Sequence, residues 1–112
     1  MNVRHTSKGP TAIVTLSGRL DAAGSPAVRR SLRELFAADH RFLVLDFAEV
    51  SFVDSSGLSV LVTALKNARA AGGDIALIRV GDQARMLLEL TRLHRVFLVA
   101  DDAETAMTAL AA

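Results

Sequence analysis

Hydrophobic and polar positions follow two different periods along this chain, which predicts that strands and helices alternate. The run Phe42-Leu43-Val44-Leu45 is continuously apolar, as expected of a strand buried on both faces of a parallel sheet. Downstream, apolar residues recur at helical spacing: Leu58, Leu61, Val62, Leu65 and Ala68. This spacing predicts a helix that begins at Ser55 or Ser56. The segment before it is therefore a turn from a strand into a helix, at the sheet edge where α/β proteins bind ligands and partners.

The N-terminal part of the chain predicts a hairpin and a first helix. Residues 2–7 and 11–17 have strand-like sequences, and the turn signal Ser7-Lys8-Gly9-Pro10 separates them. Ser25-Pro26 offers an N-cap followed by proline at the first helical position. The apolar stripe of this helix consists of Val28, Leu32, Leu35 and Phe36. The other face carries Arg29, Arg30, Arg33 and Glu34, and a solvated surface is the simplest interpretation of these charges.

The rest of the chain continues the alternation. We expect a central strand over about 41–47, with 48–52 as a link into the turn. The second helix ends at Gly72-Gly73, because glycine readily adopts a left-handed conformation there. The remaining elements are a strand over 75–80, a third helix capped by Gly81-Asp82, a strand over 96–99 and a fourth helix opened by Asp101 and Glu104. The order β-β-α-β-α-β-α-β-α predicts an α/β fold with one domain over 1–112, about five strands in a mixed, mostly parallel sheet, and four helices.

Composition narrows the classes of function. The 112 residues are 51% hydrophobic, which is enough for one core. The formal net charge is only +1, and there is neither Trp nor Tyr, so direct binding of nucleic acid is not expected. No Cys is present, and no apolar segment approaches the roughly 18 residues of a membrane span. We therefore expect a cytoplasmic protein without a membrane span.

The residues that could carry chemistry do not form a catalytic set. A serine nucleophile needs a base within reach, but His5, His40 and His94 belong to other elements. No nucleophile elbow, phosphate-binding glycine loop or metal-ligand spacing can be read. The sequence therefore predicts a protein that is not an enzyme and that holds no cofactor or metal of its own.

A hydroxyl at a helix N-terminus is the remaining candidate for chemistry. The helix dipole and the unpaired backbone N–H groups stabilise an anion there, so a phosphorylated serine would be accommodated. In the alternative interpretation, Ser55 is only an N-cap, Ser56 is a residue of the first turn and Gly57 is a packing glycine. The local sequence leaves both interpretations open.

The whole stretch resembles a known family. Leu45-Asp46-Phe47, then Phe52-Val53-Asp54-Ser55-Ser56-Gly57-Leu58, a helix and Gly72-Gly73 are similar to the STAS domain of bacterial anti-sigma-factor antagonists. Gly18-x-Leu20-Asp21 looks like the earlier Gly-x-Leu-Asp signature of that family. The resemblance extends from the first hairpin to the last helix. Two segments depart from the family pattern. Ser59-Val60 stands where many relatives have Gly-Val, and Ala22-Ala23-Gly24 stands before the first helix, where relatives often have polar residues.

The resemblance implies a phosphorylation switch. In that family, the serine directly after the Asp is phosphorylated by a partner that is both an anti-sigma factor and a serine kinase, and which binds the ATP and Mg²⁺. The corresponding residue is Ser55. The unphosphorylated antagonist binds the anti-sigma factor and releases the sigma factor, and a serine phosphatase restores this form. By resemblance, the contact surface would be lined by Asp21, Asp54, Ser56, Gly57 and Leu58.

Two other functions compete with this one. STAS domains also occur as non-switching cytoplasmic subunits of membrane transporters of the lipid-transport type, but a purely structural subunit has no need of a phosphoacceptor. A small enzyme or nucleotide-binding domain is disfavoured by the missing base, metal ligands and phosphate loop. The retained hydroxyl of Ser55 favours the anti-sigma-factor antagonist.

Overall fold

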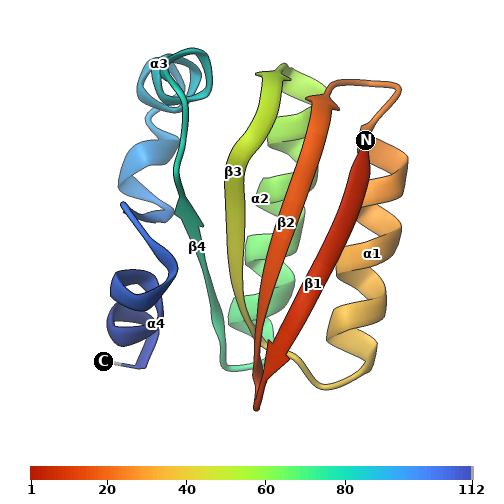
Figure 1. Cartoon of the computed structure of the whole chain (residues 1–112), viewed down its shortest axis with the longest axis vertical. Helices are drawn as coiled ribbons and strands as arrows, with labels where there is room; N and C mark the ends of the chain where they lie inside the picture. The colour runs from red at the N-terminus through yellow and green to blue at the C-terminus, as the bar shows by residue number, and fades with distance from the viewer. Residues whose placement is uncertain (112) are drawn as a thin grey trace.

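The computed structural model describes residues 1–111, and its elements follow the predicted order (Figure 1). The strands are β1 (Asn2–Lys8), β2 (Thr11–Leu20), β3 (Phe42–Val53), β4 (Asp74–Ile78) and β5 (Leu98–Ala100). The helices are α1 (Ser25–Ala37), α2 (Ser55–Ala70), α3 (Asp82–Leu90), the 3-10 turn η1 (Leu93–Arg95) and α4 (Ala103–Ala111). The predicted α/β class and element order are therefore confirmed, and η1 is an addition that the sequence pattern did not indicate.

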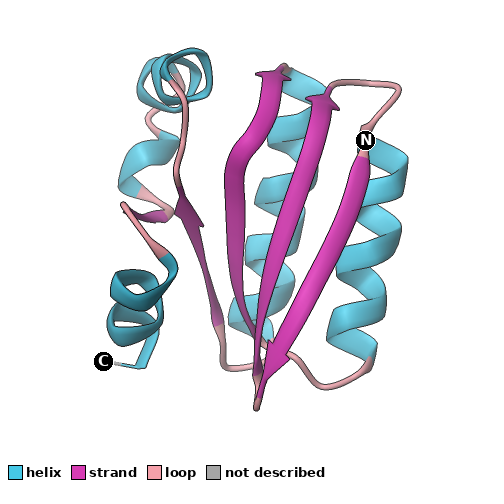
Figure 2. Cartoon of the chain, viewed as in Figure 1, coloured by secondary structure: helices cyan, strands magenta, loops and turns pink. Residues whose placement is uncertain are grey.

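The strands lie in the sheet in the order in which they occur in the chain, β1-β2-β3-β4-β5. β1 and β2 form the predicted hairpin and pair antiparallel, from Asn2 opposite Ser17 to Lys8 opposite Thr11. The pairs β2–β3, β3–β4 and β4–β5 are all parallel. The parallel strands thus point in one direction, and the loops that follow β2, β3 and β4 all leave from the same edge of the sheet (Figure 2).

Helices cover the two faces of the sheet unequally. α1 and α2 lie side by side on one face, where Leu32, Leu61 and Leu65 pack against the inward side chains of β2, β3 and β4. α3 contributes Ala84 and Leu88 to the same core. α4 packs on the opposite face and forms a smaller cluster of Val44, Ala76, Ile78 and Ala106. Burial on both faces explains the continuous apolar runs in β3 and β4.

The central strand is longer than its sequence suggested. The prediction of a strand over 41–47 followed by a link over 48–52 is wrong, because β3 runs without interruption to Val53. β2 pairs with it along this whole length, although the register shifts after Thr15 and after Gly18. The polar residues of this half do not break the strand because its outer face is open to solvent. β4, by contrast, pairs with β3 only as far as Ile78 opposite Asp46.

Three helix ends use different residues from those predicted. Ser25 does not cap α1: it is the first helical residue, it is 3% exposed, and its hydroxyl donates to the carbonyl oxygen of Asp21 at 2.6 Å. α2 begins at Ser55, as predicted, but its N-cap is Asp54. In α4, Asp102 and not Asp101 accepts from a first-turn N–H, that of Thr105, at 2.8 Å. The cap of α4 is therefore Asp102, one position after the predicted Asp101.

The end of α2 matches its prediction in detail. Gly72 has a φ of +83°, and its N–H donates to the carbonyl oxygen of Arg69. The N–H of Gly73 donates to the carbonyl oxygen of Ala68 at 2.7 Å. These two bonds form a Schellman motif, which ends a helix at a left-handed residue. The chain then enters β4 at Asp74.

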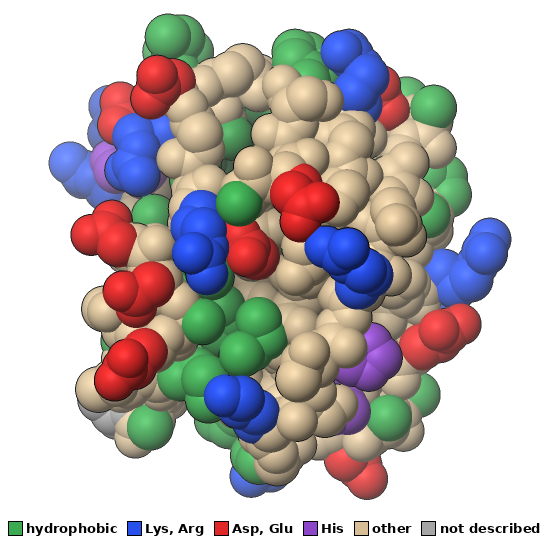
Figure 3. Space-filling view, in the orientation of Figure 1, with side chains coloured by type: hydrophobic (Ala, Val, Ile, Leu, Met, Phe, Trp, Pro, Cys, Tyr) green, Lys and Arg blue, Asp and Glu red, His purple; other side chains and the backbone are tan. Residues whose placement is uncertain are grey.

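Charges of both signs are interspersed on the face of the sheet that α1 and α2 leave open (Figure 3). Arg4 pairs with Glu49 at 2.9 Å across β1 and β3, and Arg79 pairs with Asp46 at 3.4 Å. Both arginine side chains are half exposed, so these pairs contribute little to stability. The mixed surface agrees with the small net charge of the chain.

Candidate phosphorylation and partner-binding site

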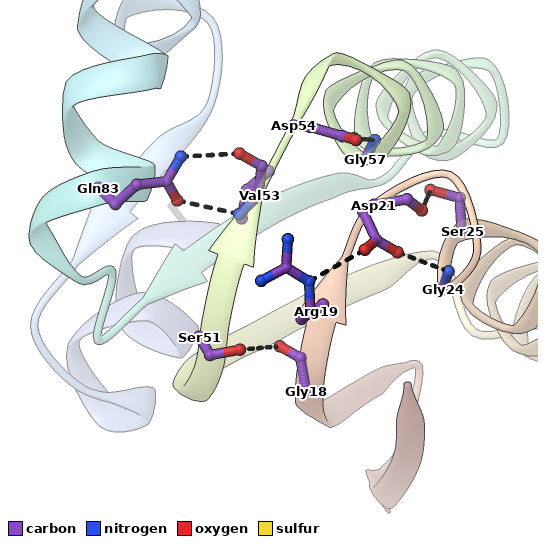
Figure 4. Close-up of polar contacts among 10 residues, drawn as sticks. All are labelled: Gly18, Arg19, Asp21, Gly24, Ser25, Ser51, Val53, Asp54, Gly57 and Gln83. Atoms are coloured by element: carbon purple, nitrogen blue, oxygen red, sulfur yellow. Dashed lines mark hydrogen bonds and ion pairs between the residues drawn. The ribbon is translucent and has the colours of Figure 1, made fainter.

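The candidate site lies at the edge of the sheet where β2 and β3 end and where α1, α2 and α3 begin. Leu20 and Val53, the last residues of the two strands, are opposite one another in the parallel ladder. The loop 21–24 leaves from Leu20, and the turn that carries Ser55 leaves from Val53 (Figure 4). The two sequence signatures are thus brought together at one edge, as their positions after neighbouring parallel strands require.

Asp54 fixes the start of α2. Its backbone is extended (φ −118°, ψ −172°), and its carboxylate accepts a hydrogen bond from the N–H of Gly57 at 3.1 Å. Its carbonyl oxygen accepts the first helical hydrogen bond, from the N–H of Leu58 at 3.0 Å. The cap is therefore a residue of the motif itself, and the hydroxyl of Ser55 is not needed for it. Ser55 is the first residue of the helix and is exposed to solvent.

Gly57 allows α2 to lie directly on the end of β2. A Cβ atom at Gly57 would lie 2.4 Å from the carbonyl oxygen of Leu20 and 2.6 Å from its Cγ. The N–H of Asp54 donates to the same carbonyl oxygen at 3.2 Å. The turn is thus held against β2 by one hydrogen bond and by a contact that only a residue without a side chain permits.

Asp21 organises the loop before α1. One carboxylate oxygen accepts from the N–H of Gly24 at 3.0 Å, and the other pairs with Nε of Arg19 at 3.1 Å. Its backbone carbonyl accepts from both the N–H and the hydroxyl of Ser25. The bond from Gly24, followed by that from Arg19, lowers the pKa of the Asp21 carboxyl below its usual range. This loop is therefore ordered and carries a fixed negative charge at neutral pH.

Arg19 and Phe52 form a second pair at the rim of the site. The guanidinium of Arg19 lies 4.5 Å from the centre of the Phe52 ring, in a cation–π arrangement. Its side chain is 62% exposed, so the group is oriented by Phe52 and Asp21 but open to solvent. Ser51 contributes a further link, because its hydroxyl donates to the carbonyl oxygen of Gly18 at 3.3 Å.

Gln83, in the first turn of α3, reaches the strand end from the other side. Its Oε1 accepts from the N–H of Val53 at 2.9 Å, and its Nε2 donates to the carbonyl oxygen of Val53 at 2.8 Å (Figure 4). A third helix is thereby connected to the residue that precedes Asp54.

The comparison with known proteins agrees with this geometry. A sequence model of the STAS domain matches residues 2–106. The chain belongs to the STAS domain family. An anti-sigma F factor antagonist from Paenibacillus polymyxa is 32% identical over 99 residues, which cover 88% of this chain and 85% of the relative. The family predicted from the residues around Asp54 and Asp21 is therefore confirmed.

Solved structures share the fold of this STAS domain. The crystal structure of an anti-sigma factor antagonist from Mycobacterium paratuberculosis is similar with a TM-score of 0.85, at 22% identity, over 99% of this chain and 94% of that one. The Bacillus cell fate determinant SpoIIAA in its phosphorylated form is similar with a TM-score of 0.75, at 20% identity, over 96% of this chain and 98% of that one. At these identities, the likeness concerns the arrangement of the backbone.

The STAS domain places the predicted site residues in two groups. Ser55 is exposed, and Asp21, Asp54 and Ser56 are half-buried at the same edge. Gly57 is buried and Leu58 is 6% exposed, so these two residues shape the site from below and present almost no surface. The side chain of Leu58 belongs to the core between α2 and the sheet.

Sequence reasoning missed three residues of the site. Gly24 is as constrained as Gly57, since a Cβ atom there would lie 2.2 Å from the carbonyl oxygen of Arg19. Its place three residues after Asp21 is a spacing at which an Asp side chain commonly accepts from a backbone N–H, which is a signal in the sequence. Arg19 could have been noted as the variable residue within the Gly-x-Leu-Asp signature. Nothing in the sequence connects Gln83 with Val53, which lies 30 residues earlier.

Residues 1–111 of this STAS domain contain neither a cluster of metal ligands nor a helix suited to cross a membrane. No group of three or more His, Asp or Glu side chains in this range is arranged to hold a metal ion. The helices of the same range include none whose length and apolar character would suffice to cross a membrane.

Proposed function

We propose that this STAS domain is an anti-sigma-factor antagonist that is switched by phosphorylation of Ser55. Without the phosphate it binds an anti-sigma factor that is also a serine kinase, and so releases a sigma factor. With the phosphate it no longer binds, until a serine phosphatase removes the group. We place this exchange in the cytoplasm. The observation that carries the proposal is the exposed hydroxyl of Ser55 at the capped start of α2. It is supported by the anti-sigma F factor antagonist that matches 88% of this chain.

The geometry suits a substrate of a kinase. Phosphoryl transfer depends on positioning and on Mg²⁺, both of which the kinase active site supplies. The substrate has only to present a hydroxyl in a fixed place. Asp54 caps α2 through Gly57, so the hydroxyl of Ser55 is not engaged in holding the helix together. The domain itself acts as a binding module and performs no reaction.

The phosphate would change the surface and leave the fold intact. It adds roughly −1.5 to −2 charges at the positive end of the α2 dipole, where a negative charge is stabilised. The new charge lies at the same edge as the carboxylates of Asp21 and Asp54. A partner that approaches this edge with acidic groups or bound nucleotide phosphates would meet like charges, which cost several kcal/mol at an interface. Phosphorylation would thus prevent binding by local repulsion and bulk.

The proposal is tested by intact-mass spectrometry after incubation with ATP, Mg²⁺ and a candidate anti-sigma kinase. We expect one added phosphate in the wild type and in Ser56→Ala, and none in Ser55→Ala. Ser59→Ala, which removes an exposed hydroxyl one turn further along α2, serves as the matched control and should accept phosphate normally. Phosphate on Ser55→Ala, or a Ser55→Ala variant that responds to the kinase as the wild type does in cells, would contradict the proposal.

A further inference from the structure

β3 extends well beyond its neighbour β4, and this leaves one of its sides without a strand partner near the site. The last paired residues of the two strands are Asp46 and Ile78, whereas β3 continues to Val53. On its other side, β3 stays paired with β2 to the end, where Leu20 is opposite Val53. The N–H and carbonyl groups of Val53 that point away from β2 therefore need another partner.

Gln83 supplies that partner with a single side chain. Its amide accepts from the N–H of Val53 at 2.9 Å and donates to the carbonyl oxygen of the same residue at 2.8 Å. One primary amide thus makes both bonds that a neighbouring strand would make. We call this pair of bonds the Gln83 clamp. Gln83 also lines a hollow of about 100 Å³ between the second half of β3 and the start of α3.

The clamp acts on the peptide that leads into the acceptor serine. The carbonyl group of Val53 belongs to the peptide bond with Asp54, and Ser55 follows directly. On the β2 side the same turn is fixed by the N–H of Asp54, which donates to the carbonyl oxygen of Leu20 at 3.2 Å. The turn is therefore held from two sides, by β2 through Leu20 and by α3 through Gln83. Without the two bonds of Gln83, the turn would be held from the β2 side alone.

We propose that Gln83 is a positioning residue for Ser55: it holds the hydroxyl in the place from which it can attack the γ-phosphate of the ATP in the kinase. This inference rests on the proposed phosphorylation of Ser55. In-line transfer requires the hydroxyl oxygen, the phosphorus and the leaving oxygen to be aligned, and a misplacement of about 1 Å can reduce such a rate by roughly a hundredfold. Gln83 is bonded to the backbone of Val53, and it acts on Ser55 only through that backbone.

Three substitutions separate the two bonds of the clamp. Gln83→Met keeps the length and the unbranched shape of the side chain but makes neither bond. Gln83→Glu can still accept from the N–H of Val53 but cannot donate to its carbonyl oxygen. Gln83→Ala removes the side chain. The matched control is Arg85→Met, at an exposed position of the same helix, where the side chain makes no hydrogen bond or ion pair with the described residues.

The first measurement needs no kinase. Amide hydrogen exchange followed by NMR should become at least tenfold faster at Val53 in Gln83→Met and in Gln83→Ala, relative to the core amides of β2. Gln83→Glu should show an intermediate rate at Val53, because one bond remains. Unchanged exchange at Val53 in Gln83→Met would overturn the inference, since the clamp would then hold nothing.

The second measurement is the rate of phosphate transfer, at a temperature where all variants are fully folded. We expect kcat for Gln83→Met to fall roughly tenfold or more with little change in KM, a smaller fall for Gln83→Glu, and no fall for Arg85→Met. Equal kcat values for the wild type and Gln83→Met would overturn the inference while leaving the proposed function in place. A wild type that accepts no phosphate from any candidate kinase would overturn the proposed function, and the inference with it.

Discussion

Gly57 lies so close to Leu20 that a methyl group on its Cα would come within 2.4 Å of the Leu20 carbonyl oxygen. The contact is to backbone, which cannot move away as the end of a flexible side chain can. We predict that Gly57→Ala destabilises the domain by about 1–3 kcal/mol, the usual cost of overpacking, despite the better helix propensity of alanine. Urea unfolding followed by circular dichroism measures this change.

A control for that substitution exists on the same helix. Ser59 is exposed, so Ser59→Ala should change the free energy of unfolding by less than about 0.5 kcal/mol. If Gly57→Ala were as stable as Ser59→Ala, α2 would not rest on Leu20 as described. A displaced but stable α2 would be recognised by altered amide shifts at Leu20 and Asp54.

Asp21 makes the stability of the domain dependent on acid pH. Its pKa is lowered by the N–H of Gly24 and then by Arg19. A carboxyl whose pKa is lower in the folded state stabilises the fold above its unfolded pKa of about 3.9, and this contribution is lost as the pH falls through the folded pKa. We predict that the wild type is more stable than Asp21→Asn at pH 6 and that the difference shrinks below about pH 4.

Urea unfolding between pH 6 and pH 3 measures that difference. Asp102, whose pKa is also lowered, is present in both proteins, so its effect cancels in the comparison. In Arg19→Met, NMR titration should show that the pKa of Asp21 moves up toward its usual value, because one cause of the shift is gone. Parallel stability curves for the wild type and Asp21→Asn would contradict the assignment.

Arg92 adopts a left-handed backbone conformation directly after the C-cap of α3. Its φ is +61° and its ψ is 15°, the conformation that usually ends a helix with glycine. A residue with a Cβ atom is strained there by about 1 kcal/mol or more. We predict that Arg92→Gly raises the free energy of unfolding by roughly 0.5–1 kcal/mol, since the greater freedom of glycine in the unfolded chain offsets part of the gain.

The comparison with Arg92→Ala isolates the backbone effect. Alanine also removes the exposed guanidinium but keeps the Cβ atom, so this variant should show no gain. Thermal unfolding of the three proteins at one pH is sufficient. A gain of the same size in Arg92→Ala would assign the effect to the lost charge instead of the backbone.

Local signals in the sequence were enough to place the start of α2 and its end at Gly72. Each of these depends on residues within a few positions of one another. The caps were harder to assign. Ser25 and Asp101 have suitable side chains, but the N-cap of α1 is Gly24, without a side-chain bond, and Asp102 makes the bond at the start of α4. Which of two nearby polar residues caps a helix depends on the position at which the helix begins. That position is set by where the preceding strand ends.

The length of β3 and the clamp at Gln83 could not be predicted from the sequence. The second half of β3 mixes Ala48, Glu49 and Ser51 with apolar residues, which is also the composition of a loop. Its strand conformation depends on pairing with β2, about 30 positions earlier in the chain, through two shifts of register. The clamp then depends on β4 being shorter than β3, which brings an α3 side chain to a strand end that has no other partner.

The arrangement of the strands in chain order has a consequence for how the molecule is made. Every ladder joins strands that are consecutive in the chain, so each strand pairs with the strand made just before it. During synthesis from the N-terminus, β1, β2, α1, β3 and α2 are made before the C-terminal residues. The serine turn and Leu20, which supports it, therefore belong to the part of the chain that is made first. Gln83 is synthesised later, so a growing chain contains its acceptor serine before it contains the side chain that we propose to position that serine.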